Sequence, residues 1–98
     1  MSYQIIRPPL HKNFELPTTE TILGLKQNQL VKVIFQAVED EPAERMWVKL
    51  TEQISDSQWK GILDNDPEGG QLKKAIKAGD EVIFHPLDII QIRDNISQ

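Results

Sequence analysis

The sequence predicts a β-rich α+β domain, in which a curved antiparallel sheet of four or five strands is combined with two short helices. Three observations predict this class. Short segments with period-two alternation recur along the chain, turn-forming Gly, Pro and Asn residues separate them, and two segments carry the signals of a helix. Such a sheet can close toward a small SH3-like, partly open barrel. A close hairpin in the middle of the chain argues against an all-helical fold or a parallel doubly wound sheet.

Several segments have the strand pattern. Period-two alternation is clearest in residues 45–52, where Met46, Val48 and Leu50 share one face. A polar turn over residues 54–57 follows, and its short length predicts an antiparallel hairpin with the next strand. The expected strands cover residues 3–7 at a sheet edge, 30–36, 45–52, 58–63 and 81–85, with a last strand or turn over 89–92.

The first helix is expected to begin after Thr18, a residue type that caps helix N-termini by accepting a backbone hydrogen bond. Ile22, Leu23 and Leu25 would form its apolar face. Asn28 would close the helix in a left-handed conformation, which asparagine tolerates better than most residues.

The second helix is expected over residues 71–78, with Leu72 and Ile76 four positions apart on one face and Gly79 at positive φ behind it. The chain around this glycine matches an earlier stretch position for position. Residues 25–31 and 76–82 align, with an asparagine in the first where Gly79 stands in the second. Either shared turn chemistry or an internal duplication explains seven matching positions, and both predict that a strand starts after the turn.

Length and composition indicate one globular domain without covalent staples. A chain of 98 residues has the size of a single core. Residues 1–15 are expected to be an N-terminal segment that is an edge strand or flexible, residues 16–93 the globular domain, and residues 94–98 a polar tail. The chain has no cysteine, which excludes disulfides, thiol nucleophiles and zinc ribbons.

Net charge and hydropathy predict which kinds of partner the chain binds and in which compartment it lies. Eleven Lys and Arg stand against 15 Asp and Glu, for a net charge of −4, which argues against nucleic acid or an anionic membrane as partner. Long apolar runs and a secretory signal pattern are both missing, so the cytoplasm is the expected location.

We expect no cofactor and no metal. The two imidazoles are far apart, and Ala75 stands where the calcium-loop-like run at residues 64–69 would need a bidentate glutamate.

Four stretches of the chain carry a resemblance to a known family. They read Val31-Lys32-Val33-Ile34-Phe35, Glu44-Arg45-Met46-Trp47-Val48, Gly61-Ile62-Leu63-Asp64-Asn65-Asp66-Pro67 and Lys77-Ala78-Gly79-Asp80-Glu81-Val82. In these stretches the chain resembles the bacterial family catalogued as domain of unknown function 2314, over about residues 16–93. The resemblance implies a compact bacterial domain and brings no activity or catalytic residues with it.

Trp47 is the most informative candidate for a binding site. If Met46 and Val48 face the core, the pleat of the strand sends Trp47 to the other face, among cations. An exposed Trp flanked by Arg and Lys is typical of a binding hot spot. The expected partner-binding residues are Arg45, Trp47, Lys49, Lys60 and Ile62. Two alternatives stay open: a helix or the Pro-rich N-terminal segment covers this face, or the opposite register turns both tryptophans inward.

The leading hypothesis for function is therefore a non-enzymatic module that binds a protein partner through the Trp47 face. A second hypothesis is a small-molecule or peptide-binding barrel, or a modest enzyme, with a ligand rim at His85 and Asp88. A third is a nucleic-acid-binding barrel, for which Lys73, Lys74 and Lys77 would supply a basic stripe. A free edge at the N-terminal strand would also allow two copies of the chain to pair as a homodimer.

Overall fold

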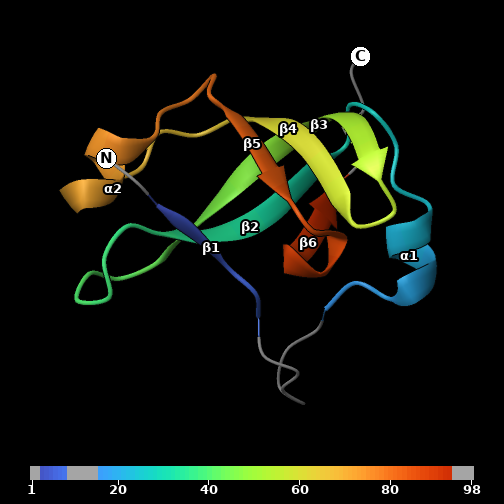
Figure 1. Cartoon of the computed structure of the whole chain (residues 1–98), viewed down its shortest axis with the longest axis horizontal. Coiled ribbons are helices and arrows are strands. Elements are labelled where there is room, and N and C mark those ends of the chain that lie inside the picture. Colours follow the sequence, from blue (N-terminus) through green and yellow to red (C-terminus); the bar gives the residue numbers. More distant parts are fainter. Residues whose placement is uncertain (1–2, 9–15, 94–98) are drawn as a thin grey trace.

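The computed structural model describes residues 3–8 and 16–93, in which six strands form one antiparallel sheet (Figure 1). The strands are β1 (Gln4–Ile6), β2 (Leu30–Gln36), β3 (Glu44–Ser55), β4 (Gln58–Leu63), β5 (Glu81–Phe84) and β6 (Ile89–Arg93). They are accompanied by α1 (Thr19–Leu23), α2 (Gly70–Ala75) and a 3-10 turn, η1 (Pro86–Asp88). The sheet runs in the order β1-β2-β3-β4-β5 and curls into a half-barrel, with β6 paired to β2. The predicted α+β class is confirmed.

β2 is hydrogen-bonded along both of its edges. β3 takes one edge in the register Lys32↔Trp47. On the other edge β6 pairs with the first half of β2 and β1 with the second half, in the register Ile6↔Ile34. β1 and β6 therefore lie end to end beside the same strand. The edge strand expected over residues 3–7 is present as β1, whereas the expected flexible part of residues 1–15 and the polar tail 94–98 lie outside the described residues.

The core fills the inner side of the curled sheet. The inward faces of the strands supply most of it, as the alternating pattern predicts. Leu72 and Ile76, around α2, close one end of the core, and Leu25, after α1, closes another. The buried cluster comprises Leu25, Val31, Val33, Phe35, Met46, Val48, Leu50, Trp59, Leu63, Leu72, Ile76, Val82, Phe84 and Ile89.

The β3–β4 hairpin is tighter than expected. The predicted polar turn over residues 54–57 is wrong at its first positions, because β3 continues to Ser55 and Ser55 pairs with Gln58. Asp56 and Ser57 alone make the turn, and a two-residue connection suits the twist of two paired strands. Register shifts near Leu50 and Gln53 mark irregular pairing in the longer strand.

The first helix is shorter than predicted. Thr18 caps it as expected, since its hydroxyl accepts a hydrogen bond from the Thr21 amide at 3.2 Å. The helix ends at Leu23, whose side chain is 82% exposed and does not join the core. Gly24 caps the helix with φ −93°, so the prediction that Asn28 closes it is wrong. Most helices in proteins are stabilised by tertiary packing of their apolar face. Because Leu23 does not pack against the core, nothing extends this five-residue helix beyond it.

The second helix also ends early. α2 stops at Ala75 because Ile76 adopts an extended conformation with φ −152°, which carries its side chain into the core beside Leu72. Both α1 and α2 are short, and no helix in the described part of the chain has the length and apolarity needed to cross a bilayer.

The matching stretches 25–31 and 76–82 fold into the same turn. The residue at positive φ is Asn28 in the first (75°) and Gly79 in the second (96°). The amide of Asn28 donates to the Leu50 carbonyl at 2.8 Å, and that of Gly79 donates to the Leu63 carbonyl, also at 2.8 Å. Each turn thus binds one strand of the β3–β4 hairpin at a buried leucine.

The residues that follow the two positive-φ positions, Gln29 and Asp80, also make equivalent hydrogen bonds. The Gln29 side chain accepts from the Lys26 amide at 2.8 Å, and the Asp80 side chain accepts from the Lys77 amide at 3.0 Å. The carbonyls of the same two residues accept from the amides of the hairpin leucines, at 2.9 Å in both cases. We name these segments the first turn (residues 25–31) and the second turn (residues 76–82).

Candidate functional site

Trp47 lies on the outer face of the sheet, opposite the core. Its neighbours in β3, Met46 and Val48, are buried, whereas Trp47 is half-buried and Arg45 is exposed. Trp59 lies on the inner side and is 5% exposed. The chain therefore carries one tryptophan on each side of the sheet, as the alternation predicts for this register.

The predicted partner-binding residues share this outer face. Lys49 stands directly opposite Ile62 of β4, and residues paired across antiparallel strands point to the same side. Lys60 lies two positions before Ile62 on the same face, where its ammonium contacts Glu52 at 3.2 Å and Glu81 at 3.8 Å. The structure brings Arg45, Trp47, Lys49, Lys60 and Ile62 together as one surface, which we call the Trp47 face.

Trp47 is held firmly in place. Its backbone amide donates to the side-chain oxygen of Asn65 at 2.7 Å, and its carbonyl accepts from the Asp64 amide at 2.9 Å. The ammonium of Lys32, which stands opposite Trp47 on β2, lies 4.7 Å from the ring centroid. This distance is within the range of a cation–π interaction, so one face of the ring already has a cationic neighbour.

Two contributors to the Trp47 face were not among the predicted site residues. Lys32 faces outward by the alternation of residues 30–36, but its place beside Trp47 depends on the register between β2 and β3. Asn65 reaches Trp47 from the loop after β4, and no periodic pattern identifies such a contact. The alternation shows that Lys32 faces outward but not that it lies beside Trp47, and Asn65 left no signal in the sequence.

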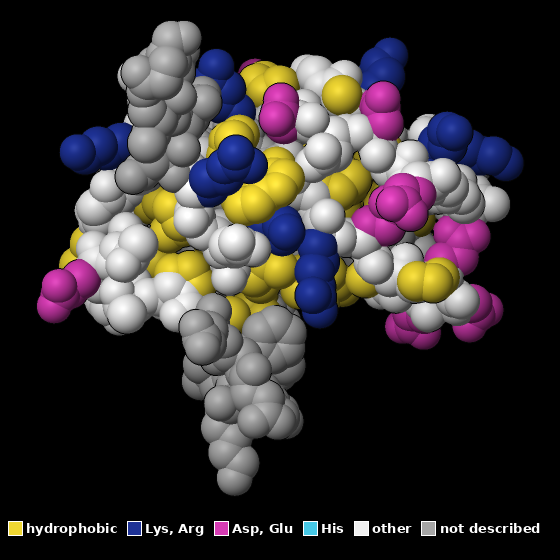
Figure 2. Space-filling view, turned by 180° about the vertical axis from the view of Figure 1, so that it is seen from behind, with side chains coloured by type: hydrophobic (Ala, Val, Ile, Leu, Met, Phe, Trp, Pro, Cys, Tyr) yellow, Lys and Arg dark blue, Asp and Glu magenta, His cyan; other side chains and the backbone are white. Residues whose placement is uncertain are grey.

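The Trp47 face is basic although the whole chain is acidic. Among residues 3–8 and 16–93 no carboxylate lies within ion-pair distance of Lys32 or Lys49. Figure 2 views the molecule from the side of β2 and β3 and shows Lys and Arg side chains among hydrophobic ones across its middle. Asp and Glu side chains are more numerous toward one end of the same view.

The predicted ligand rim at His85 and Asp88 forms the cap of η1. Nδ1 of His85 accepts from the Leu87 amide at 2.9 Å, and the Asp88 carboxylate accepts from the His85 amide at 3.0 Å. The other Asp88 oxygen accepts from Nε of Arg7 at 3.0 Å, and Asp88 is only 8% exposed. These contacts fix the 3-10 turn and link it to the end of β1. They give both side chains a structural role.

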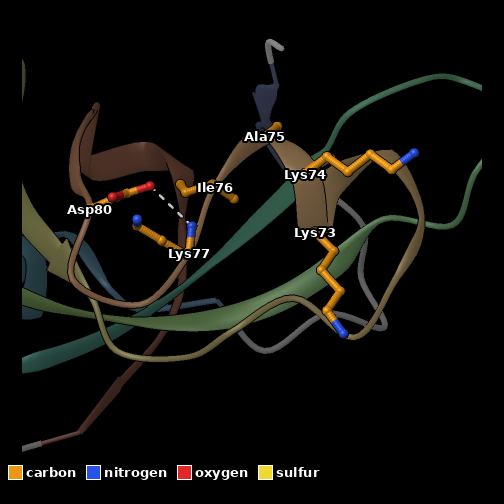
Figure 3. Close-up of a pocket in the computed structure, with 6 residues that line it drawn as sticks. All are labelled: Lys73, Lys74, Ala75, Ile76, Lys77 and Asp80. Carbon is orange, nitrogen blue, oxygen red and sulfur yellow. Dashed lines mark hydrogen bonds between the residues drawn. The ribbon is translucent and has the colours of Figure 1, made fainter.

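The lysines of α2 do not converge on one point. They line a cavity of about 310 Å³ beside Ile76 and Asp80. In Figure 3, Lys73 and Lys74 point away from each other, and Asp80 binds the backbone amide of Lys77. The basic stripe expected here is thus spread over the surface of a short helix and the second turn.

An acidic hollow of about 460 Å³ lies between the β2–β3 loop and the start of α2. Two of the carboxylates that line it already hold backbone amides. Glu41 accepts from the Gln71 amide and Glu44 from the Glu68 amide, each at 2.8 Å. The loop between β2 and β3 therefore fastens these strands to the segment that leads into α2.

The fold and the Trp47 face together define a small half-barrel domain with a basic outer sheet surface centred on the half-buried Trp47. Comparison of the chain with models of protein families, with curated proteins and with solved structures finds no match. The function is therefore inferred from the residues of this chain and their geometry.

Proposed function

We propose that the protein is a non-enzymatic interaction module that binds a partner protein through the Trp47 face. The observation that carries this proposal is the fixed position of Trp47 in the middle of an outward sheet face, between the cations of β2 and β3. A large aromatic side chain that is ordered before binding loses little conformational entropy when a partner covers it. Trp and Arg are also the residue types enriched at binding hot spots.

The surroundings of Trp47 support the same proposal. The ring is half-buried and its backbone is hydrogen-bonded on both sides, so the surface exists before a partner arrives. Ile62 and Lys49 extend the surface across β4 and β3 with apolar and cationic groups side by side. The alternative rim at His85 and Asp88 has less support, because both side chains are engaged in capping η1.

Membership in the domain of unknown function 2314 family and a place in the bacterial cytoplasm are part of the same proposal. The first is supported by the four stretches quoted above, and the second by a composition without cysteine. Neither assigns a partner.

A capture experiment with matched variants tests the proposal. The wild-type chain, Trp47→Ala and Leu87→Ala are each immobilised and exposed to cell lysate, and retained proteins are identified by mass spectrometry. Leu87 is a control because it is 53% exposed and lies on η1, away from the Trp47 face. We expect at least one protein to be retained by the wild type and by Leu87→Ala and lost with Trp47→Ala.

Stability is measured in parallel, so that a folding defect is not mistaken for lost binding. We expect Trp47→Ala to change the free energy of unfolding by roughly 1 kcal/mol, as for a half-buried surface residue. If Trp47→Ala unfolds, Ile62→Thr tests the same face, since Thr keeps the β-branched shape that a strand favours. Retention of the same proteins by the wild type and by a folded variant of this face would contradict the proposal.

A further inference from the structure

We propose that the segment bound by the Trp47 face is acidic, with carboxylates on either side of an apolar side chain. This inference rests on the proposed function and adds the chemistry of the partner. It comes from a row of side chains that crosses the sheet from β6 to β4, at right angles to the strands.

The row alternates cationic and apolar side chains. Arg93 pairs with Leu30, Leu30 with Lys49, and Lys49 with Ile62, so these four residues follow one another across neighbouring strands on the outer face. The two charged residues are exposed and the two apolar residues are half-buried, with Leu30 between the two cations and Ile62 on the far side of Lys49. Since neighbouring strands lie about 4.8 Å apart, the cationic positions are separated by about 10 Å with an apolar position between them.

This pattern is complementary to a peptide in the polyproline II conformation with acidic side chains three positions apart, because three residues per turn bring such side chains back to the same side. Three residues in this conformation span about 9 Å, which is close to the distance between the cationic positions. An apolar side chain between the two carboxylates would then meet Leu30 or the ring of Trp47. Trp47 belongs to the pair Lys32↔Trp47, which lies two positions along the strands from the pair Leu30↔Lys49. Lys32 would reinforce the positive potential there, because it too has no carboxylate partner in the described residues.

Beyond Ile62 the row meets negatively charged side chains, which favour a protein as the partner over a nucleic acid. Ile62 pairs with Glu81 of β5, and Glu81 and Glu52 both contact Lys60. A uniformly charged phosphate backbone that followed the row would meet these carboxylates, in a chain whose net charge is already −4. The ring of Trp47 also has Lys32 over one of its faces, which reduces its value as a stacking platform for bases.

Titration of the labelled protein with a synthetic peptide tests the inference. The probe is a peptide of four Glu-Leu-Ser repeats with blocked ends, the control is its Gln-Leu-Ser counterpart, and binding is followed by amide and indole chemical shifts in NMR spectra. We expect the acidic peptide to shift signals of outward residues on β2, β3 and β4. The affinity should fall as salt is raised from about 50 mM to about 300 mM, because exposed charges are screened.

Two charge-reversal variants separate the row from general electrostatics. Lys49→Glu with Arg93→Glu reverses both cationic positions of the row, whereas Lys73→Glu with Lys74→Glu makes the same change in net charge on α2. All four residues are exposed, so both variants are expected to fold. We expect the first variant to bind the acidic peptide about tenfold more weakly and the second to bind it nearly as the wild type does.

Three results would overturn the inference: equal binding of the neutral peptide, shifts confined to α2 and the second turn, or equal weakening in both variants. Tighter binding of a twelve-nucleotide oligothymidylate to the same residues would replace a protein partner by a nucleic acid. The proposed function is judged separately. A captured protein that depends on Trp47 but still binds Lys49→Glu with Arg93→Glu would leave the interaction module standing and remove the acidic segment.

Discussion

Gly61 illustrates how a single residue sets the packing beneath the Trp47 face. It is buried in β4 opposite Leu50. A Cβ atom at this position would lie 2.5 Å from Cγ1 of Val48 and 2.7 Å from the carbonyl oxygen of Lys49. The backbone oxygen cannot rotate away, so the strands themselves would have to separate.

We expect Gly61→Ala to lower the free energy of unfolding by about 1–3 kcal/mol, the usual cost of an overpacked core. Urea denaturation measures the change. Gly69→Ala is the control, since a Cβ there meets nothing within 4 Å and the backbone is extended. Equal stabilities of the two variants would show that β3 and β4 absorb the extra methyl group without strain.

At the same scale, the sequence predicted which way Trp47 points but not what holds it. The alternation of β3 sends Trp47 away from Met46 and Val48, and the structure follows that alternation. The contact with Asn65 depends on the path of an irregular loop, and the contact with Lys32 on the register of β2. Both are tertiary properties, which local periodicity does not encode.

At the scale of elements, the first and second turns are interchangeable units. Both place one residue at positive φ and hold it by the same hydrogen bonds to the β3–β4 hairpin. Asparagine fills this position in one turn and glycine in the other, the two residue types that adopt it at low cost.

We expect Asn28→Ala and Gly79→Ala each to lower the free energy of unfolding by about 1–2 kcal/mol, because a Cβ is strained at positive φ. The exchanged variants Asn28→Gly and Gly79→Asn should cost less than about 1 kcal/mol. No atom lies within 4 Å of a Cβ built at Gly79, so sterics with neighbours do not add to the effect there. Chemical denaturation of the four variants tests this, and equal losses in all four would refute the equivalence of the two turns.

The bounds of the elements were predicted well where sequence periodicity determines them and poorly where tertiary packing determines them. β2 and β4 have the expected bounds because alternating apolar residues face one core. The helices ended early because Leu23 found no packing partner and Ile76 reached the core in an extended conformation. Propensity favours more helix at both places, but tertiary packing overrides it.

At the scale of the whole molecule, two groups link stability to alkaline pH. A hydrogen bond with Glu52 raises the pKa of Lys60, and the charges of Glu52 and Glu81 add to this effect. Burial raises the pKa of Tyr3, with a further contribution from the charge of Asp80. Both groups therefore keep their protons to higher pH in the folded chain than in the unfolded one.

We expect the contribution of these groups to the free energy of unfolding to be constant below about pH 10 and to be lost as the pH rises through their folded-state pKa values. The double variant Lys60→Met with Tyr3→Phe should lose less stability than the wild type between pH 9 and pH 11. Urea denaturation at the two pH values measures the difference. The same loss in both proteins would mean that neither group contributes to the alkaline dependence.

The double pairing of β2 has a consequence for the order in which the chain can fold. β2, β3, β4 and β5 lie beside one another in the sheet in the same order as in the chain, so this meander can assemble from contacts between consecutive strands. The second edge of β2 is different, because Val31 pairs with Ile92, about 60 positions further along the chain. Contacts between distant positions form more slowly, since a long loop must close first. On a ribosome, β2 therefore keeps part of one edge open until β6 has been synthesised, which makes the last strand the step that completes the fold.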